Sequence, residues 1–148
     1  MNKIVAIGSD HIGFEHKQFL IEKLEKQGYQ LIDIGTFGKE RTDYPIYAEK
    51  VAELIVSGNA NAGILICGTG IGISIAANKL QGIRCALCAD EFSALMSREH
   101  NNSNIIAFGA NIISCEKALA LATLWLNTPY DVGRHQKRLD MIEAFEQY

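Results

Sequence analysis

The sequence predicts an α/β fold, a three-layer αβα, Rossmann-like single domain whose doubly wound parallel sheet has five strands. Five short apolar runs carry this prediction, at residues 4–8, 30–34, 63–67, 84–89 and 105–109. Each run is nearly continuous rather than alternating, which is typical of strands buried on both faces. Longer amphipathic stretches separate the runs. Strands and helices that alternate in this way favour a parallel sheet covered on both sides.

Each gap between the runs, and the C-terminal part of the chain, contains a helix signal. Phe14, Leu20 and Leu24 recur at helical spacing, and Gly28 ends that helix. Pro45 is suited to the first turn of a second helix, with Asp43 close to its cap. The remaining helices are predicted at residues 73–80, 91–99, 114–127 and about 134–147.

Length and charge restrict the class of protein. The chain has 148 residues and 48% hydrophobic residues, which fits one domain spanning 1–148. Its net charge of −3 argues against a general nucleic-acid-binding or anionic-membrane-binding protein, so any bound phosphate needs a local site. The apolar runs are too short to cross a bilayer, and no signal peptide is recognised. We expect a cytoplasmic protein with reduced cysteines.

The segment after the third predicted strand carries most of the functional information. The strand ends at Cys67, three glycines follow at alternate positions, and a helix then begins; the glycines are Gly68, Gly70 and Gly72. Such a loop can turn its N–H groups inward to bind an anion, and the helix N-terminus adds partial positive charge. Two other interpretations stay open. The glycines could serve packing alone, or they could belong to a dinucleotide site, with Asp90 as the ribose-binding acid. The third glycine of that fingerprint, however, would fall at Ile73.

Cys67 is the candidate reactive group of this loop. The nest and the helix N-terminus both favour its thiolate form, although a lone strand cysteine is usually a small buried hydrophobe. Cys85 and Cys88 lie three apart on a predicted strand, so they point to opposite faces and cannot easily share a metal or a disulfide. We expect no metal site. A redox role for Cys67 would need a resolving cysteine, and none lies nearby in the sequence.

Further polar groups occur in the loops expected to border this site. Asp10 and His11 follow the first strand, and His100 and Asn101 end the fourth helix. Either histidine could act as a general acid or base near neutral pH, or could be a surface residue. Tyr44, with Arg41 and its neighbours, could form a wall of the same pocket.

The last predicted helix offers a pair of cations. Arg134 and Arg138 are four residues apart, so on a helix they share a face. Two guanidinium groups suit a phosphate, while a solvated basic patch is the alternative.

Together these segments resemble the type B ribose-5-phosphate isomerase family, which also includes allose- and galactose-6-phosphate isomerases. The resemblance spans nearly the whole chain and keeps the order of the motifs. The matching segments are Gly8-Ser9-Asp10-His11 with Gly13 and Lys17, Arg41-Thr42-Asp43-Tyr44-Pro45, Ile66-Cys67-Gly68-Thr69-Gly70-Ile71-Gly72-Ile73-Ser74, Arg98-Glu99-His100-Asn101, Phe108-Gly109 and Gly133-Arg134-His135-Gln136.

The resemblance implies a role for each position. Cys67 is the implied base, Thr69 the group that helps move a proton between the sugar oxygens, and Asp10 and His100 the ring-opening groups. The backbone amides of Gly68, Gly70, Ile71 and Gly72, with Asn101, would stabilise an enediolate. His11 would lie beside the phosphate or sugar, and Arg134, His135 and Arg138, in the C-terminal helix, would hold the phosphate.

The family implies a cofactor-free enzyme that interconverts ribose 5-phosphate and ribulose 5-phosphate in the non-oxidative pentose phosphate pathway. It also implies a homodimer, or a tetramer built from it, with shared pockets to which the partner subunit supplies His100 and Asn101. A hexose 6-phosphate such as allose 6-phosphate is the alternative substrate, and a non-catalytic nucleotide- or flavin-binding module is the alternative of another class. One position departs from the family: Asn111 stands where an arginine often serves as a further phosphate ligand.

Overall fold

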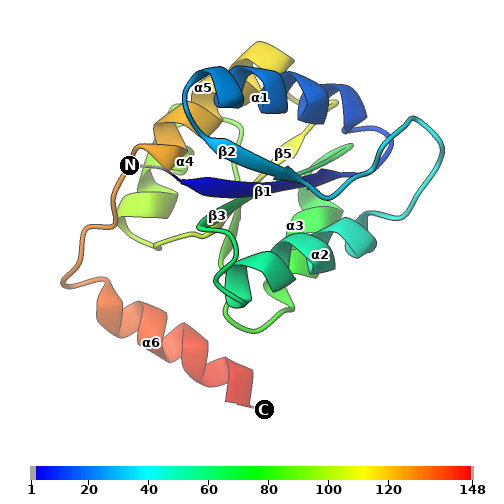
Figure 1. The fold of residues 1–148 in the computed structure, drawn as a ribbon. Helices are drawn as coiled ribbons and strands as arrows, with labels where there is room; N and C mark the ends of the chain where they lie inside the picture. The colour runs from blue at the N-terminus through cyan, green and yellow to red at the C-terminus, as the bar shows by residue number, and fades with distance from the viewer. Residues whose placement is uncertain (1–2, 148) are drawn as a thin grey trace.

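A single parallel sheet of five strands forms the centre of the molecule (Figure 1). The computed structural model describes residues 3–147. The strands are β1 (Ile4–Ser9), β2 (Gln30–Asp33), β3 (Ala62–Cys67), β4 (Cys85–Leu87) and β5 (Ile105–Gly109). Their spatial order is β2-β1-β3-β5-β4, with every neighbouring pair parallel. The predicted fold class is therefore confirmed.

Helices cover both faces of the sheet (Figure 1). On one face α1 (Phe14–Lys26) packs on α5 (Cys115–Leu126), which in turn contacts α4 (Glu91–Glu99). On the other face α2 (Tyr44–Val56) packs on α3 (Ile71–Asn78). The chain ends in α6 (Gln136–Ala144) and the short 3-10 helix η1 (Phe145–Gln147), which lie apart from the layers (Figure 1).

The core is divided by the sheet, and β3 shows how. Ile64 and Ile66 pack into the cluster under α1 and α5, while Leu65 and Cys67 pack into the cluster under α2 and α3. All six residues of β3 are buried, which explains why this strand appears in the sequence as a continuous apolar run.

The structure corrects three predicted boundaries. The last helix begins at Gln136 instead of residue 134, because Gly133 has φ 145° and its carbonyl accepts a hydrogen bond from Gln136 N–H at 3.0 Å, closing a turn before the helix. Arg134 therefore does not share a helix face with Arg138. The fourth strand, predicted at 84–89, spans only Cys85–Leu87, and the third helix begins at Ile71, directly after the glycine loop.

The chain places its loops alternately at two edges of the sheet. We call the edge where the strands end the carboxyl edge, and the opposite edge the amino edge. The loops after β1 and β3 meet at the carboxyl edge, where Asp10 N–H donates to the carbonyl of Ile66 at 3.2 Å. The segment that follows α4 lies at the amino edge, where Gly63 N–H donates to the carbonyl of Asn104 at 2.9 Å.

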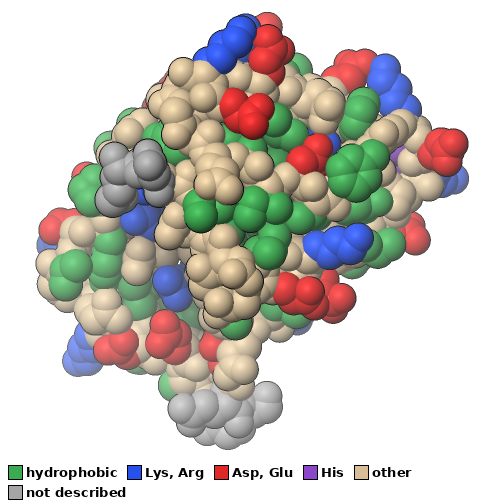
Figure 2. Space-filling model, viewed as in Figure 1, with side chains coloured by type: hydrophobic (Ala, Val, Ile, Leu, Met, Phe, Trp, Pro, Cys, Tyr) green, Lys and Arg blue, Asp and Glu red, His purple; other side chains and the backbone are tan. Residues whose placement is uncertain are grey.

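On the face of the molecule seen in Figure 2, Lys and Arg side chains lie among Asp and Glu rather than in a separate basic patch. Between residues 3 and 147 the structure contains no helix that is both long and apolar enough to cross a membrane.

Candidate active site

At the carboxyl edge, the thiol of Cys67 faces the glycine loop. Cys67 is 4% exposed, and its Sγ accepts a hydrogen bond from the backbone N–H of Gly70 at 3.2 Å. The Thr69 hydroxyl accepts a hydrogen bond from Ile71 N–H, also at 3.2 Å, at the start of α3. The amide of Gly70 thus donates toward the sulfur.

Two glycines of the loop have no room for a side chain. Gly70 has φ 78°, and a Cβ there would lie 2.5 Å from Leu87 Cδ1 and 2.9 Å from the backbone of Phe108. A Cβ on Gly72 would lie 2.5 Å from the Tyr44 ring. The ring of Tyr44, the first residue of α2, therefore lies directly against the loop at Gly72.

Asp10 and His11 lie in the adjacent loop after β1. Asp10 Oδ1 accepts hydrogen bonds from Ile12 N–H at 3.0 Å and Gly13 N–H at 3.1 Å, which fixes the carboxylate against the backbone. The ring Nδ1 of His11 accepts a hydrogen bond from Thr42 N–H at 3.2 Å. Since Nδ1 is the acceptor, the proton of the neutral ring is on Nε2, which can act as a donor.

Asn111, the position that departs from the family pattern, also lies at this edge. Its N–H donates to the carbonyl of Gly68 at 2.9 Å, and its side-chain Nδ2 lies beside Gly68. The residue is exposed. We define the carboxyl-edge cluster as Cys67, Thr69, the Gly68–Gly72 amides, Asp10, His11 and Tyr44.

A second group of the predicted residues gathers at the amino edge. The rings of His100 and His135 stack with their centroids 4.1 Å apart and an interplanar angle of 22°. His135 is 6% exposed, and Arg134 Nε lies 3.4 Å from its Nε2. Burial lowers the pKa of His135, and the charges of His100, Arg134 and Arg138 lower it further. We define the amino-edge cluster as His100, Asn101, Arg134, His135 and Arg138.

The two clusters lie at opposite ends of the strands. The six residues of β3 separate the edges by about 16 Å at the usual rise of a strand. The expectation that the loops of His11 and His100 border one site is therefore wrong within a single chain. Parallel connections explain it: a loop that follows a strand lies at the carboxyl edge, and the loop that follows the next helix returns to the amino edge.

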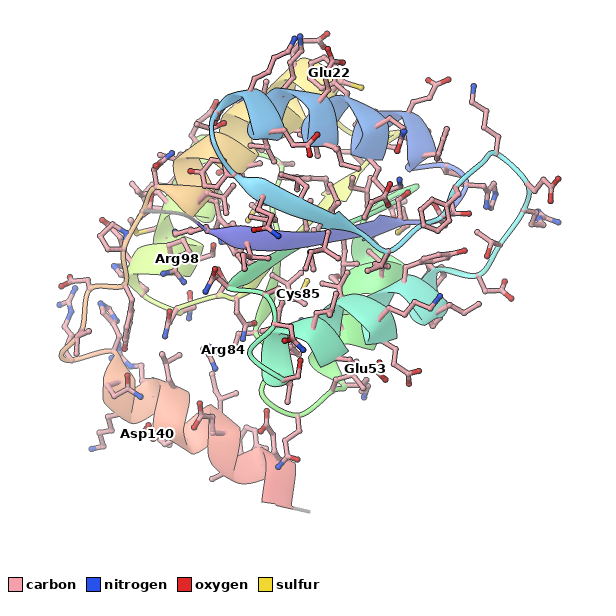
Figure 3. All side chains as sticks on the ribbon, in the orientation of Figure 1. Glu22, Glu53, Arg84, Cys85, Arg98 and Asp140 are labelled. Carbon is pink, nitrogen blue, oxygen red and sulfur yellow. The ribbon has the colours of Figure 1, made fainter. Side chains whose placement is uncertain are left out.

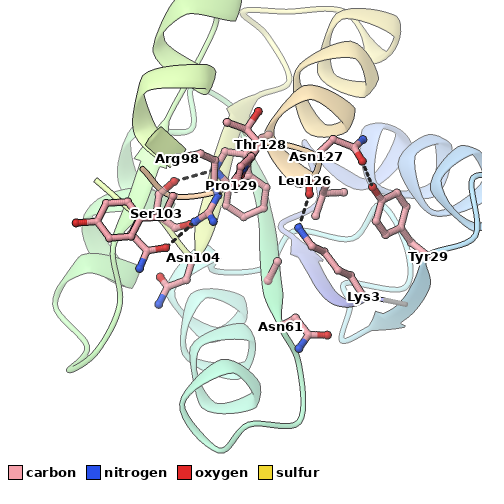
Figure 4. Close-up of a pocket in the computed structure, with 14 residues that line it drawn as sticks. Lys3, Tyr29, Asn61, Arg98, Ser103, Asn104, Leu126, Asn127, Thr128 and Pro129 are labelled. Atoms are coloured by element: carbon pink, nitrogen blue, oxygen red, sulfur yellow. Dashed lines mark hydrogen bonds between the residues drawn. The ribbon is translucent and has the colours of Figure 1, made fainter. Parts of the chain in front are cut away.

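Arg98 is a residue that the sequence analysis did not single out for a role. From α4 it donates to the carbonyl of Thr128 at 2.9 Å, the carbonyl of Ser103 at 2.6 Å and Asn102 Oδ1 at 2.9 Å (Figure 4). It lies beside a cavity of about 610 Å³ at the amino edge, which contains none of the predicted site residues. An arginine that binds backbone carbonyls leaves no periodic signal in a sequence.

The other cysteines have structural surroundings. Cys85 and Cys88 belong to the cores on opposite faces of the sheet, as predicted. Burial raises the pKa of Cys85 to about 12 and that of Cys88 to about 11, so both stay protonated near neutral pH. Within residues 3–147, no group of three or more His, Cys, Asp or Glu residues is arranged to hold a metal ion.

Comparison with known proteins gives matches over almost the full length of the chain. The model of the Ribose/Galactose Isomerase family matches residues 5–142, which includes both clusters. The chain is 48% identical over 145 residues to ribose-5-phosphate isomerase B of Escherichia coli, covering 98% of this chain and 97% of the relative.

Solved structures give the same result. The structure of ribose-5-phosphate isomerase B from Clostridium thermocellum superposes with a TM-score of 0.96 at 46% identity, covering 97% of each chain. A Mycoplasma genitalium ribose-5-phosphate isomerase B, solved with bound ribulose-5-phosphate, superposes with a TM-score of 0.92 at 32% identity, covering 97% of this chain and 96% of the other. The chain therefore belongs to the ribose/galactose isomerase family and, within it, to the type B ribose-5-phosphate isomerases.

Proposed function

We propose that this protein interconverts D-ribose 5-phosphate and D-ribulose 5-phosphate through an enediolate, as a step of the non-oxidative pentose phosphate pathway, with Cys67 as the base. The observation that carries the proposal is the hydrogen bond from Gly70 N–H to Cys67 Sγ, at the end of a buried strand and beside the glycine loop. Family membership supports the substrate, because the relative solved with a bound sugar contains ribulose-5-phosphate.

The chemistry needs a base, a proton shuttle and stabilisation of oxyanion charge. The Cys67 thiolate takes the proton from C2 of the opened aldose, the C2–H electron pair forms the C1=C2 bond, and the carbonyl electron pair moves onto O1 to give the enediolate. Thr69 helps transfer the O2 proton to O1. The Cys67 thiol then returns its proton to C1, leaving the ketose carbonyl at C2. The amides of the Gly68–Gly72 loop, with Asn101, donate to the oxygens that carry charge.

Ring opening and phosphate binding use the remaining groups. Asp10 and His100 open the furanose ring, and His11 donates from Nε2 to the sugar or its phosphate. The cations Arg134 and Arg138 attract the phosphate, together with His135. None of these steps draws on an external cofactor or a metal ion.

The pocket is proposed to be shared between two copies of the chain. Cys67 and His100 lie at opposite edges of one sheet, so a single chain holds two half-sites rather than one site. Several apolar side chains around the carboxyl-edge cluster are exposed: Ile12 at 44%, Ile71 at 51%, Ile75 at 55% and Ile112 at 60%. Burial of such a surface against a second copy is favourable, and a two-fold dimer would bring the amino-edge cluster of each copy to the carboxyl-edge cluster of the other.

Proton exchange tests the role of Cys67. In D2O the wild type should incorporate deuterium at C2 of ribose 5-phosphate, and Cys67→Ala should lose about 100- to 10,000-fold in exchange and isomerisation. Cys115→Ala is the matched control, because Cys115 lies at the start of α5, outside both clusters, and it should retain full activity. A folded Cys67→Ala protein with normal exchange would refute the assignment of the base.

Two alternative functions would give different experimental results. A preference for a hexose 6-phosphate would appear as a higher kcat/KM for allose 6-phosphate than for ribose 5-phosphate. A nucleotide- or flavin-binding module would shift its melting temperature with AMP or FMN, would not respond to pentose phosphates, and would show no C2 exchange.

A further inference from the structure

Two arginines, Arg98 and Arg84, donate hydrogen bonds to the turn that contains His100 and Asn101. Asn102, the last residue of this turn, has φ 46°, in the left-handed region that residues other than glycine rarely adopt. Arg98 binds its side chain and the next carbonyl, as described above. From the other side, Arg84 Nε lies 3.1 Å from the carbonyl oxygen of Asn101 and 3.0 Å from that of Asn102. The unusual backbone is therefore held in one conformation by its surroundings.

Arg84 is itself firmly placed. Its backbone N–H donates to Asn104 Oδ1 at 2.8 Å, and its carbonyl accepts from Asn104 N–H at 3.0 Å. Its side chain is only 20% exposed. A guanidinium group fixed at its base in this way can direct its donors at a defined point, which a more mobile surface cation cannot.

The same guanidinium group also reaches the last helix. Arg84 Nη1 forms an ion pair with Glu143 Oε1 of α6 at 3.4 Å, and Figure 3 shows Arg84 between Arg98 and α6. A second acidic side chain of this segment, Glu146, accepts a hydrogen bond from Gly82 N–H at 3.0 Å. The C-terminal helical segment, which contains Arg138, is thus attached by acidic side chains to the segment that immediately precedes β4.

We propose that Arg84 is a positioning residue that sets the amino-edge cluster in register: its Nε orients the turn with His100 and Asn101, and its Nη1 orients α6 with Arg138. This inference rests on the proposed isomerase function. Arg84 does not touch substrate in this scheme. It acts through residues that do. Its Nε orients the turn whose residues take part in the proposed reaction, and its Nη1 orients the helix that carries a proposed phosphate-binding arginine.

The link to α6 can be removed alone, and the two links can be disturbed together. Arg84→Lys keeps the charge but replaces the planar Nε/Nη fork with a single ammonium group, so it disturbs both links. Glu143→Gln removes the ion pair with α6 and leaves the bonds to the turn intact. Glu22→Gln is the matched control, because Glu22 forms an exposed ion pair with Lys26 within α1 and does not pair with the turn or with α6.

We expect Arg84→Lys to lower kcat for ribose 5-phosphate by about 10- to 100-fold, because small displacements of catalytic groups are costly. Glu143→Gln should raise KM about two- to fivefold at unchanged kcat, as befits a partly exposed ion pair. Glu22→Gln should change neither parameter. If folded Arg84→Lys and Glu143→Gln proteins keep wild-type kcat and KM, with at most a lower melting temperature, Arg84 is merely structural and the inference is overturned.

Amide hydrogen exchange tests the positioning role of Arg84 independently of activity. Arg84→Lys should speed exchange in residues 100–104 and 134–138, and Glu143→Gln only in residues 134–138. Unchanged exchange in both variants would overturn the positioning role. If the variants show this exchange pattern but the wild type does not isomerise ribose 5-phosphate, the proposed function is overturned and the coupling through Arg84 stands.

Discussion

Gly70 shows how narrowly the geometry around Cys67 is determined at the scale of one residue. Its N–H is the group that donates to the sulfur, and its left-handed φ aims that N–H. The side chain of Leu87 and the backbone of Phe108 occupy the space that a Cβ would need. The loop therefore depends on glycine here for two separate reasons, the conformation of the backbone and the lack of space.

A matched pair of substitutions separates these reasons. Gly82 has φ 83°, close to the 78° of Gly70, but a Cβ there would come only within 3.6 Å of Val56. Gly82→Ala should cost about 1 kcal/mol of unfolding free energy, from the backbone conformation alone. Gly70→Ala should cost clearly more and also lower kcat. Equal losses of unfolding free energy in the two variants, measured in urea, would show that Leu87 and Phe108 move easily to make room for the added Cβ.

At the scale of elements, a partly buried ion pair connects α1 to the end of β2. Lys17 of α1 is fully buried, and its Nζ lies 2.9 Å from both carboxylate oxygens of Asp33. Asp33 also accepts a hydrogen bond from Gly35 N–H at 3.0 Å, so the pair fixes the start of the loop that leads to Tyr44.

Removal of one partner of this pair should be costly. Asp33→Asn leaves the Lys17 ammonium uncompensated and should destabilise the protein by about 3–5 kcal/mol in urea unfolding. The double variant with Lys17→Met should lose less than the sum of the two single variants. Lys26→Met, in the exposed pair with Glu22, should change stability by at most about 0.5 kcal/mol. Strict additivity at Lys17 and Asp33 would contradict a coupled pair.

The contact between α4 and the turn before α6 should depend on pH. Because the folded protein lowers the pKa of His135 below its ordinary 6.5, the neutral ring is favoured in the fold. The stability that His135 contributes is thus complete above pH 6.5 and is lost as the pH falls below that value. The charges that face the ring are His100, Arg134 and Arg138, opposed in part by Asp131.

Hydrogen exchange in residues 133–138, measured at pH 7.5 and 5.5, checks this dependence. The wild type should exchange faster at the lower pH, after correction for the intrinsic rate. His135→Phe keeps an aromatic ring against His100 without a titrating nitrogen, so it should lose this part of the pH effect. An identical pH effect in both proteins would assign it to another group.

At the scale of the whole molecule, the two clusters make a strong prediction about assembly. If each pocket combines Cys67 of one copy with His100 of another, a mixture of inactive Cys67→Ala and His100→Ala proteins should regain activity. Each mixed dimer would contain one intact pocket and one doubly altered pocket, so a fully exchanged equal mixture should reach about a quarter of wild-type activity. A mixture that stays inactive after subunit exchange would show that the pocket is not shared.

The sheet and the carboxyl-edge cluster could be predicted from the sequence because their signals are local. Continuous apolar runs report burial on both faces, and Cys67 with its glycines forms one uninterrupted segment. The position of His100 at the amino edge depends on the path of α4 back across the sheet. Its stacking on His135 depends on the segment between α5 and α6, which has no periodic sequence pattern. The bonds of Arg84 and Arg98 go to backbone carbonyls, which any sequence supplies.

The separation of α6 from the layers bears on the order in which the molecule is made. During synthesis the chain emerges from its N-terminus, and domains generally begin to fold in that order. All five strands and the helices α1 to α5 precede Asn127, whereas Arg134 and Arg138 come later. A nascent chain can therefore complete its sheet, with Cys67 already at the end of β3, before these two arginines leave the ribosome. The proposed base is therefore in place early, and the arginines proposed to bind the phosphate are added last.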